Sequence, residues 1–151
     1  MEEWEKQFLV CIEEAKQFTK VANSINQFDV DEMLNGGMYS FAVNISLACE
    51  LFLKAIKIYE TKGRSYKRNH NLHKLYNDIS KQAKEEINQE FYESDENNLY
   101  NLREFLKREG NSFLKWRYAF ENGCEISVSI FTLFSRVLEK YVDKLRGEIN
   151  E

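Results

Sequence analysis

Apolar residues recur at spacings of three and four along most of this chain, which is the period of an amphipathic α-helix. The segment FAVNISLACELFLKAIKIY is apolar nearly all round, as expected for a central helix packed on several sides. Other segments show a single apolar stripe. The pattern predicts helices over residues 2–27, 38–62, 72–83, 99–110, 112–122 and 125–149. The segment KEEINQEFYESDENN is polar and acidic, and we interpret it as a helix tail followed by a connection.

Composition supports an all-α domain. The 151 residues include no proline, so nothing removes a backbone N–H donor from a long helix. Most of the six glycines fall between or at the ends of the periodic segments and act as punctuation. A chain of this size with 43% hydrophobic residues suits one domain with its own core. We therefore expect a single all-α domain over residues 1–151.

Several classes of protein are disfavoured by the same survey. The cysteines Cys11, Cys49 and Cys124 are far apart and have no metal-ligand spacing, so we expect small buried thiols in a reducing compartment. No apolar run approaches the roughly 20 residues of a membrane span, and no signal-peptide pattern opens the chain. These observations predict a cytoplasmic protein with no metal and no cofactor.

Charge is segregated along the chain although the net charge is only −4. Residues 1–34 and 85–100 are strongly acidic, whereas residues 35–84 hold nine cations and three acids. The whole-chain charge argues against a general nucleic-acid binder. A local basic surface within residues 54–84 is nevertheless expected.

Glu50 and Lys54 form the first candidate site. They are four residues apart on the otherwise apolar central helix, with the acid first, the order that favours an ion pair. One interpretation is an ordinary exposed helix pair. The other is a polar stripe that lines a cleft.

A second candidate lies in WRYAFE, residues 116–121. Arg117 and Glu121 are again four residues apart, and aromatic residues including Tyr118 surround them. An arginine among aromatic rings can present a planar donor fork to a phosphate. It can equally be a structural arginine paired with Glu121 or Glu50.

The third candidate is YKRNHNLHKLY, residues 66–76, which holds both histidines of the chain. A histidine that moves a proton and an arginine that stabilises a phosphorane could together cleave RNA through its 2′-hydroxyl. Arg68, His70 and His73 are the candidate catalytic residues. The alternative is a helix entrance with a basic rim, in which His70 packs at the helix start and His73 is solvated.

Taken together, three segments resemble the HEPN domains, small helical modules of prokaryotic toxin–antitoxin and defence systems. The segments are ISLACELFLKAIKIYETKG, HNLHKLYNDI and FLKWRYAFE, in that order. The resemblance implies a bundle of four to five up-and-down helices, frequently a homodimer, with a role related to RNA or nucleotides.

One departure from the family pattern bears on function. Ribonuclease members carry a late arginine followed after four to six positions by a histidine, and here no histidine follows His73. We therefore expect a non-catalytic module that binds RNA, a nucleotide or a protein partner such as a cognate nucleotidyltransferase. The residues expected to bind the ligand are Glu50, Lys54, His70, Arg117, Tyr118 and Glu121. The alternatives are a metal-independent endoribonuclease toxin and a helical scaffold that only dimerises.

Overall fold

The computed structural model describes residues 1–25, 28–65, 68–117 and 128–150, and every regular element in these ranges is helical. The long helices are α1 (Glu3–Asn23), α3 (Met38–Thr61), α5 (Lys81–Ser94) and α9 (Val128–Ile149). The shorter elements are α2 (Val30–Glu32), the π-helical turn η1 (Met33–Gly37), α4 (Leu72–Asp78), α6 (Leu102–Glu109) and α7 (Ser112–Arg117). The prediction of an all-α helical bundle is confirmed.

Polar side chains fix where several helices begin. Asn71, Ser80 and Asn101 each precede a helix and accept a hydrogen bond from the backbone N–H three residues later, at 3.0, 3.1 and 3.0 Å. Such caps satisfy a backbone donor that has no partner within the helix. Asp29 caps α2 in the same way. The sequence predicts a cap at Asp29 or Asp31 for a short helix and at Asn69 or Asn71 for the helix after the basic loop, and the structure assigns these caps to Asp29 and Asn71.

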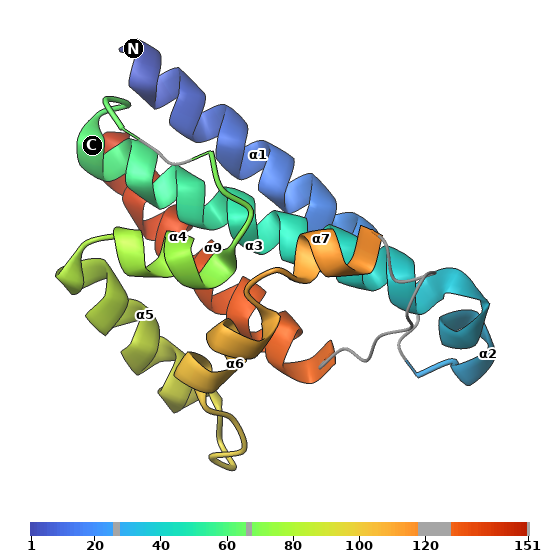
Figure 1. Cartoon of the computed structure of the whole chain (residues 1–151). Helices are drawn as coiled ribbons and strands as arrows, with labels where there is room; N and C mark the ends of the chain where they lie inside the picture. Colours follow the sequence, from blue (N-terminus) through green and yellow to red (C-terminus); the bar gives the residue numbers. More distant parts are fainter. Residues whose placement is uncertain (26–27, 66–67, 118–127, 151) are drawn as a thin grey trace.

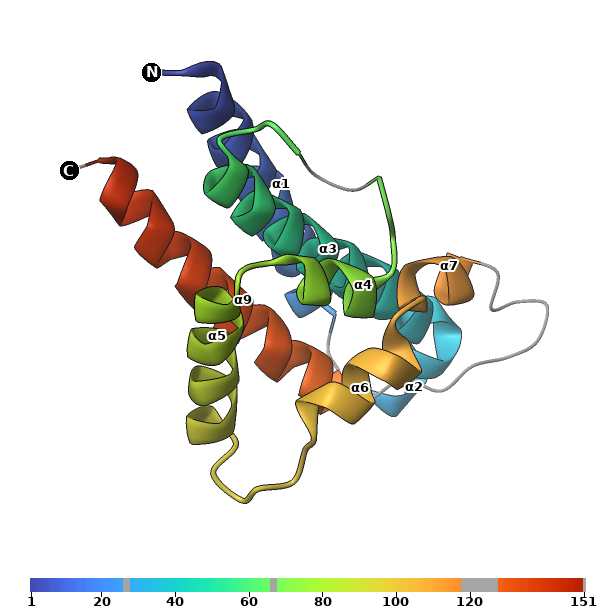
Figure 2. The ribbon, with the colours of Figure 1, turned by 60° about the vertical axis from the view of Figure 1, so that its left-hand side comes forward.

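Helix α3 is the axis of the molecule (Figure 1). Helix α1 lies beside it and runs in the opposite direction, while α4, α5 and α6 lie on the other side. Helix α9 runs along α3 so that both helices end at the same end of the molecule, where the Tyr59 hydroxyl donates to Glu148 at 2.5 Å. Figure 2 shows the same bundle with α5 and α6 on either side of a long connection. The sequence predicts that the helix over 38–62 is central and that the helix over 125–149 packs along it, and the structure confirms both.

Most of the core is one large cluster that all the long helices share, and Ala42 with Trp116 forms a small second cluster. Its largest fully buried side chains include Phe8, Phe41, Phe52, Phe91, Phe105, Phe131 and Phe134. Burying a side chain of this size stabilises the fold by roughly 1.5–3 kcal/mol. The apolar pattern also places Leu51 and Leu133 in the core, but the structure shows both only partly buried. Cys11 and Cys49 are buried free thiols, as expected, whereas Cys124 lies outside the described residues.

The structure corrects one boundary. The predicted helix through residues 72–83 is broken at Ile79, whose backbone is extended, and Ser80 caps a new helix there. The acidic segment that follows is a helix tail and then a connection, as the sequence predicts, because α5 continues to Ser94 before the chain leaves the helix. Ile87 and Phe91 give this tail an apolar face that is buried against the core.

Candidate functional site

Glu50 is a carboxylate placed in the interior of the molecule. It lies on α3, and only 2% of its side chain is exposed. Lys54, one turn later, donates from Nζ to Glu50 Oε1 at 2.7 Å and is itself only 15% exposed. The interpretation of an ordinary exposed pair is therefore wrong, because a buried carboxylate requires a partner to offset the loss of its hydration.

His70 reaches the same carboxylate from the chain between α3 and α4. Its Nδ1 lies 2.9 Å from Glu50 Oε1, and its ring packs against Phe113 of α7 at 5.3 Å between centroids. The side chain is 49% exposed. In the neutral tautomer that donates from Nδ1 to Glu50, the other ring nitrogen, Nε2, carries a free lone pair. The contact thus fixes the position of the ring.

The backbone beside His70 is fastened to the α6–α7 turn. The Leu72 N–H donates to the Gly110 carbonyl at 2.8 Å, and the Asn71 amide donates to Asn111 at 3.0 Å. A side chain at Gly110 would place its Cβ 2.8 Å from the Asn71 Oδ1 atom, so a larger residue there would displace the side chain that caps α4. The start of α4 is therefore held from α3 and from the α6–α7 turn.

The two oxygens of the Glu50 carboxylate differ in their hydrogen bonding. Lys54 and His70 both contact Oε1, while the buried Oε2 has no hydrogen-bond partner among the described residues. Lys54 offsets the charge of the carboxylate. Glu50, Lys54 and His70 together form the Glu50 cluster.

The two histidines serve different parts of the molecule. His70 belongs to the Glu50 cluster, whereas His73 lies on α4 and lines a separate cavity with residues of α5 and α6. The interpretation of His70 as a residue packed at the helix start fits its contacts with Glu50 and Phe113. Arg68, the proposed partner of a catalytic histidine, is exposed.

Part of the predicted site falls beyond what the structure describes. Tyr118 and Glu121 lie outside the described residues, and so does the side chain of Arg117, whose backbone ends α7. The pairing of Arg117 with Glu121 or Glu50 therefore stays a prediction. Of the expected ligand-binding residues, the structure brings together Glu50, Lys54 and His70.

A second buried carboxylate, Glu109, was missed by sequence reasoning. It is 3% exposed at the end of α6 and accepts a hydrogen bond from Ser112 Oγ at 2.6 Å. Arg108 and Lys115 each place a nitrogen 3.4 Å from its carboxylate. Its position in a charged stretch, LKREGNS, gave no sign of burial, because the burial depends on the turn between two short helices.

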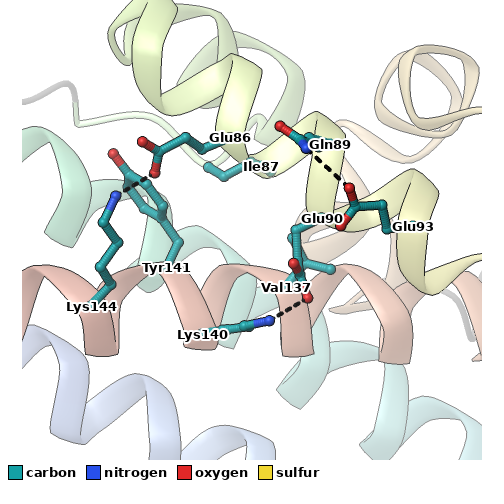
Figure 3. A pocket seen from close by; sticks show the side chains of 9 residues that line it. All are labelled: Glu86, Ile87, Gln89, Glu90, Glu93, Val137, Lys140, Tyr141 and Lys144. Atoms are coloured by element: carbon teal, nitrogen blue, oxygen red, sulfur yellow. Dashed lines mark hydrogen bonds and ion pairs between the residues drawn. The ribbon is translucent and has the colours of Figure 1, made fainter.

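Two ion pairs span a groove between α5 and α9 (Figure 3). Lys140 pairs with Glu90 at 2.7 Å, and Lys144 pairs with Glu86 at 2.6 Å. The groove encloses about 240 Å³. Because its lysines are engaged by carboxylates of the facing helix, we interpret the groove as a helix–helix seam.

No family model, no curated protein and no solved structure matches the chain. The HEPN resemblance therefore stays a prediction. None of the described helices has both the length and the apolar composition of a membrane span. Within the same residues, no three His, Cys, Asp or Glu side chains are grouped as a metal site would require.

Proposed function

We propose that this chain is a HEPN-type module that binds single-stranded RNA through its phosphates and does not cleave it. The RNA would lie on the basic segment, defined as residues 62–74 with the cations Lys62, Arg64, Lys67, Arg68 and Lys74. A toxin–antitoxin or defence context, a homodimeric state and a nucleotidyltransferase partner belong to the same proposal, since the family resemblance implies them.

The observation that carries the proposal is the attachment of the basic segment to α3. The Glu50 cluster and the Leu72–Gly110 hydrogen bond hold the end of the segment in place. Arg64, Arg68 and Lys74 are exposed, and no carboxylate of the described residues pairs with them. Cations on an anchored backbone lose less conformational freedom when a phosphate binds.

Cleavage asks for more than this surface offers. Transfer through the 2′-hydroxyl needs one group to take its proton and another to protonate the leaving oxygen. His70 is the one imidazole in the Glu50 cluster, and His73 lines a cavity with other residues. The arrangement favours binding over catalysis.

A metal-independent endoribonuclease is the second candidate, and one contact favours it. A buried carboxylate that orients a histidine through Nδ1 leaves Nε2 as a positioned base, the relation found in nucleophilic and acid–base sites. In that case Arg68 or Arg117 would stabilise the phosphorane. The two candidates differ in whether bound RNA survives.

The binding test is fluorescence anisotropy with a labelled single-stranded RNA at several salt concentrations. Each phosphate neutralised adds about 0.7 to the slope of log affinity against log salt. Arg64→Gln/Arg68→Gln is expected to weaken binding and to flatten the slope by about 1.4. The matched control Lys20→Gln/Arg136→Gln removes two exposed cations of α1 and α9 and should bind as the wild type does. Equal affinity of both double variants would overturn the proposal.

The cleavage test uses the same RNA with EDTA present. His70→Gln keeps an amide donor for Glu50 but removes the titratable ring, so the basic segment should stay anchored. We expect intact RNA with the wild type and with the variant. Cleavage by the wild type that His70→Gln abolishes, with binding retained, would establish the second candidate instead.

A further inference from the structure

A cavity between α4, α5 and α6 is distinct from the Glu50 cluster and encloses about 360 Å³. This volume falls in the range of small-molecule sites, about 300–1,000 Å³. Its polar lining comes from all three helices. The polar lining includes His73, Asn77, Asn88, Tyr92, Arg103 and Lys107.

The lining is basic and holds no carboxylate. Arg103 and Lys107 lie four residues apart on α6, so they share one face of the helix, and His73 faces the cavity from α4. No ion-pair partner is found for these three side chains in the described part of the chain. Like charges four residues apart on a helix repel each other. An anion between them would remove the repulsion.

The cations of the α5–α9 groove, unlike those of the cavity, have ion-pair partners among the described residues. There each lysine already pairs with a carboxylate of the facing helix, at 2.6–2.7 Å (Figure 3). In the α4–α6 cavity the cations are gathered without such partners. The charge arrangement therefore points to a ligand from outside the chain.

Among the neutral side chains that line the cavity, Asn88 offers amide N–H donors and Tyr92 offers an aromatic ring. The Tyr76 hydroxyl donates to Asn88 Oδ1 at 2.6 Å, and burial raises the pKa of Tyr76 to about 12, so the hydroxyl keeps its proton. The Asn88 oxygen is thus engaged, and its amide N–H groups remain for a ligand. The ring of Tyr92 is 44% exposed and offers a flat surface at the same cavity.

We propose that the α4–α6 cavity binds a small molecule that carries a pyrophosphate group, through Arg103, Lys107 and His73. The Arg103 guanidinium can bind two phosphate oxygens at once, while Lys107 acts as a point charge. Asn88 donates to a further oxygen, and Tyr92 covers the organic part of the ligand. The proposal does not rest on RNA binding at the basic segment, because it uses different cations.

The test is isothermal titration calorimetry of the full chain with inorganic pyrophosphate, ADP and adenosine. Pyrophosphate and ADP are expected to bind, and adenosine is not, because the cations recognise the phosphates. Tighter binding of ADP than of pyrophosphate would indicate that the ring of Tyr92 contributes. Adenosine binding as tight as that of ADP would overturn the assignment to the pyrophosphate group.

Matched variants locate the site. Arg103→Gln is expected to weaken pyrophosphate binding about tenfold or more, since hydrogen bonds to a charged group are worth about 1.5–3 kcal/mol. Lys107→Gln should have a similar effect. The control Arg136→Gln removes an exposed cation of α9 that does not line the cavity, and it should leave affinity unchanged. Equal weakening by all three variants would indicate general attraction of anions and would overturn the proposal.

The two proposals can fail separately. Arg64→Gln/Arg68→Gln should leave pyrophosphate binding unchanged. Loss of pyrophosphate binding in that variant, with Arg103→Gln unaffected, would move the anion site to the basic segment. Pyrophosphate binding without any RNA binding would support the cavity and contradict only the function proposed for the basic segment.

Discussion

Glu50 places a buried carboxylate on a mostly apolar helix, and its hydrogen-bond partners determine the free-energy cost of burying it. An unpaired charge at this depth would be strongly unfavourable, but Lys54 and His70 both reach its Oε1 atom. The same contacts join α3 to the chain that enters α4. A single side chain therefore contributes to the interior of the bundle and to the position of the basic segment.

Glu50→Ala is expected to lower the free energy of unfolding by about 2–3 kcal/mol. The change leaves Lys54, which is 15% exposed, without its partner and opens a small cavity. Urea denaturation followed by circular dichroism measures the effect. The control is Glu13→Ala, which breaks an exposed pair with Arg146 and should cost less than about 1 kcal/mol. Similar losses in both variants would show that the Glu50 cluster does not stabilise the fold.

Sequence reasoning found this site only in part. The spacing of Glu50 and Lys54 predicted that they pair, but it left open whether the pair is exposed or lines a cleft, and the structure shows it to be mostly buried. The contact with His70 could not be derived, because it depends on how the chain between α3 and α4 folds back. Phe113 and Glu109 were missed for the same reason, since both are placed by the α6–α7 turn.

At the scale of the elements, the break between α4 and α5 shows where periodicity is insufficient. Ile79, Ala83 and Ile87 are all buried and keep the helical spacing across the break. The apolar pattern therefore continues although the helix does not. The polar signal was present in Ser80, which caps α5, but a serine inside an apolar period is ambiguous without the fold.

The end of α3 provides a prediction about glycine. Gly63 has a φ of +75°, and a Cβ there would lie 2.9 Å from the Cβ of Trp4 on α1. Gly63→Ala should therefore destabilise the protein by about 1–3 kcal/mol, through backbone strain and the clash. Chemical denaturation provides the measurement.

Gly147 is the matched control for this change. It lies within α9, has no positive φ, and a Cβ added there would meet no other atom within 4 Å. Gly147→Ala is expected to raise stability by about 0.5–1 kcal/mol, because alanine loses less conformational freedom in a helix. Destabilisation by Gly147→Ala, or none by Gly63→Ala, would contradict the geometry of these two helix ends.

At the scale of the whole molecule, the bundle separates its charged surfaces. His70 of the basic segment contacts α3 and α7, the basic cavity lies among α4, α5 and α6, and the acidic side chains of α5 pair with lysines of α9. The linear charge pattern predicted a local basic surface, and α3 as the centre followed from its all-round apolarity. The separation into a segment and a cavity required the break that turns α4 away from α5.

Three tyrosines link the stability of the bundle to alkaline pH. The hydrogen bond to Glu148 raises the pKa of Tyr59 to about 12, and burial, with a smaller contribution from Glu86, does the same for Tyr141. Burial also raises the pKa of Tyr76 to about 12. The unfolded value is near 10. Their contribution to stability is therefore fully present below about pH 10 and is lost as pH rises toward 12, because the unfolded chain releases these protons first.

Tyr141→Phe tests this linkage. The Tyr141 side chain is partly buried, so after allowance for solvent screening its share of the stability lost between pH 10 and 12 is about 1 kcal/mol. Urea midpoints measured from pH 8 to 11.5 should fall for both proteins, since lysines also titrate there, but less steeply for the variant. Absorbance at 295 nm reports phenolate directly and should show later ionisation in the folded wild type than in urea. Parallel pH profiles of the two proteins would show that the Tyr141 phenol titrates alike in the folded and unfolded chain.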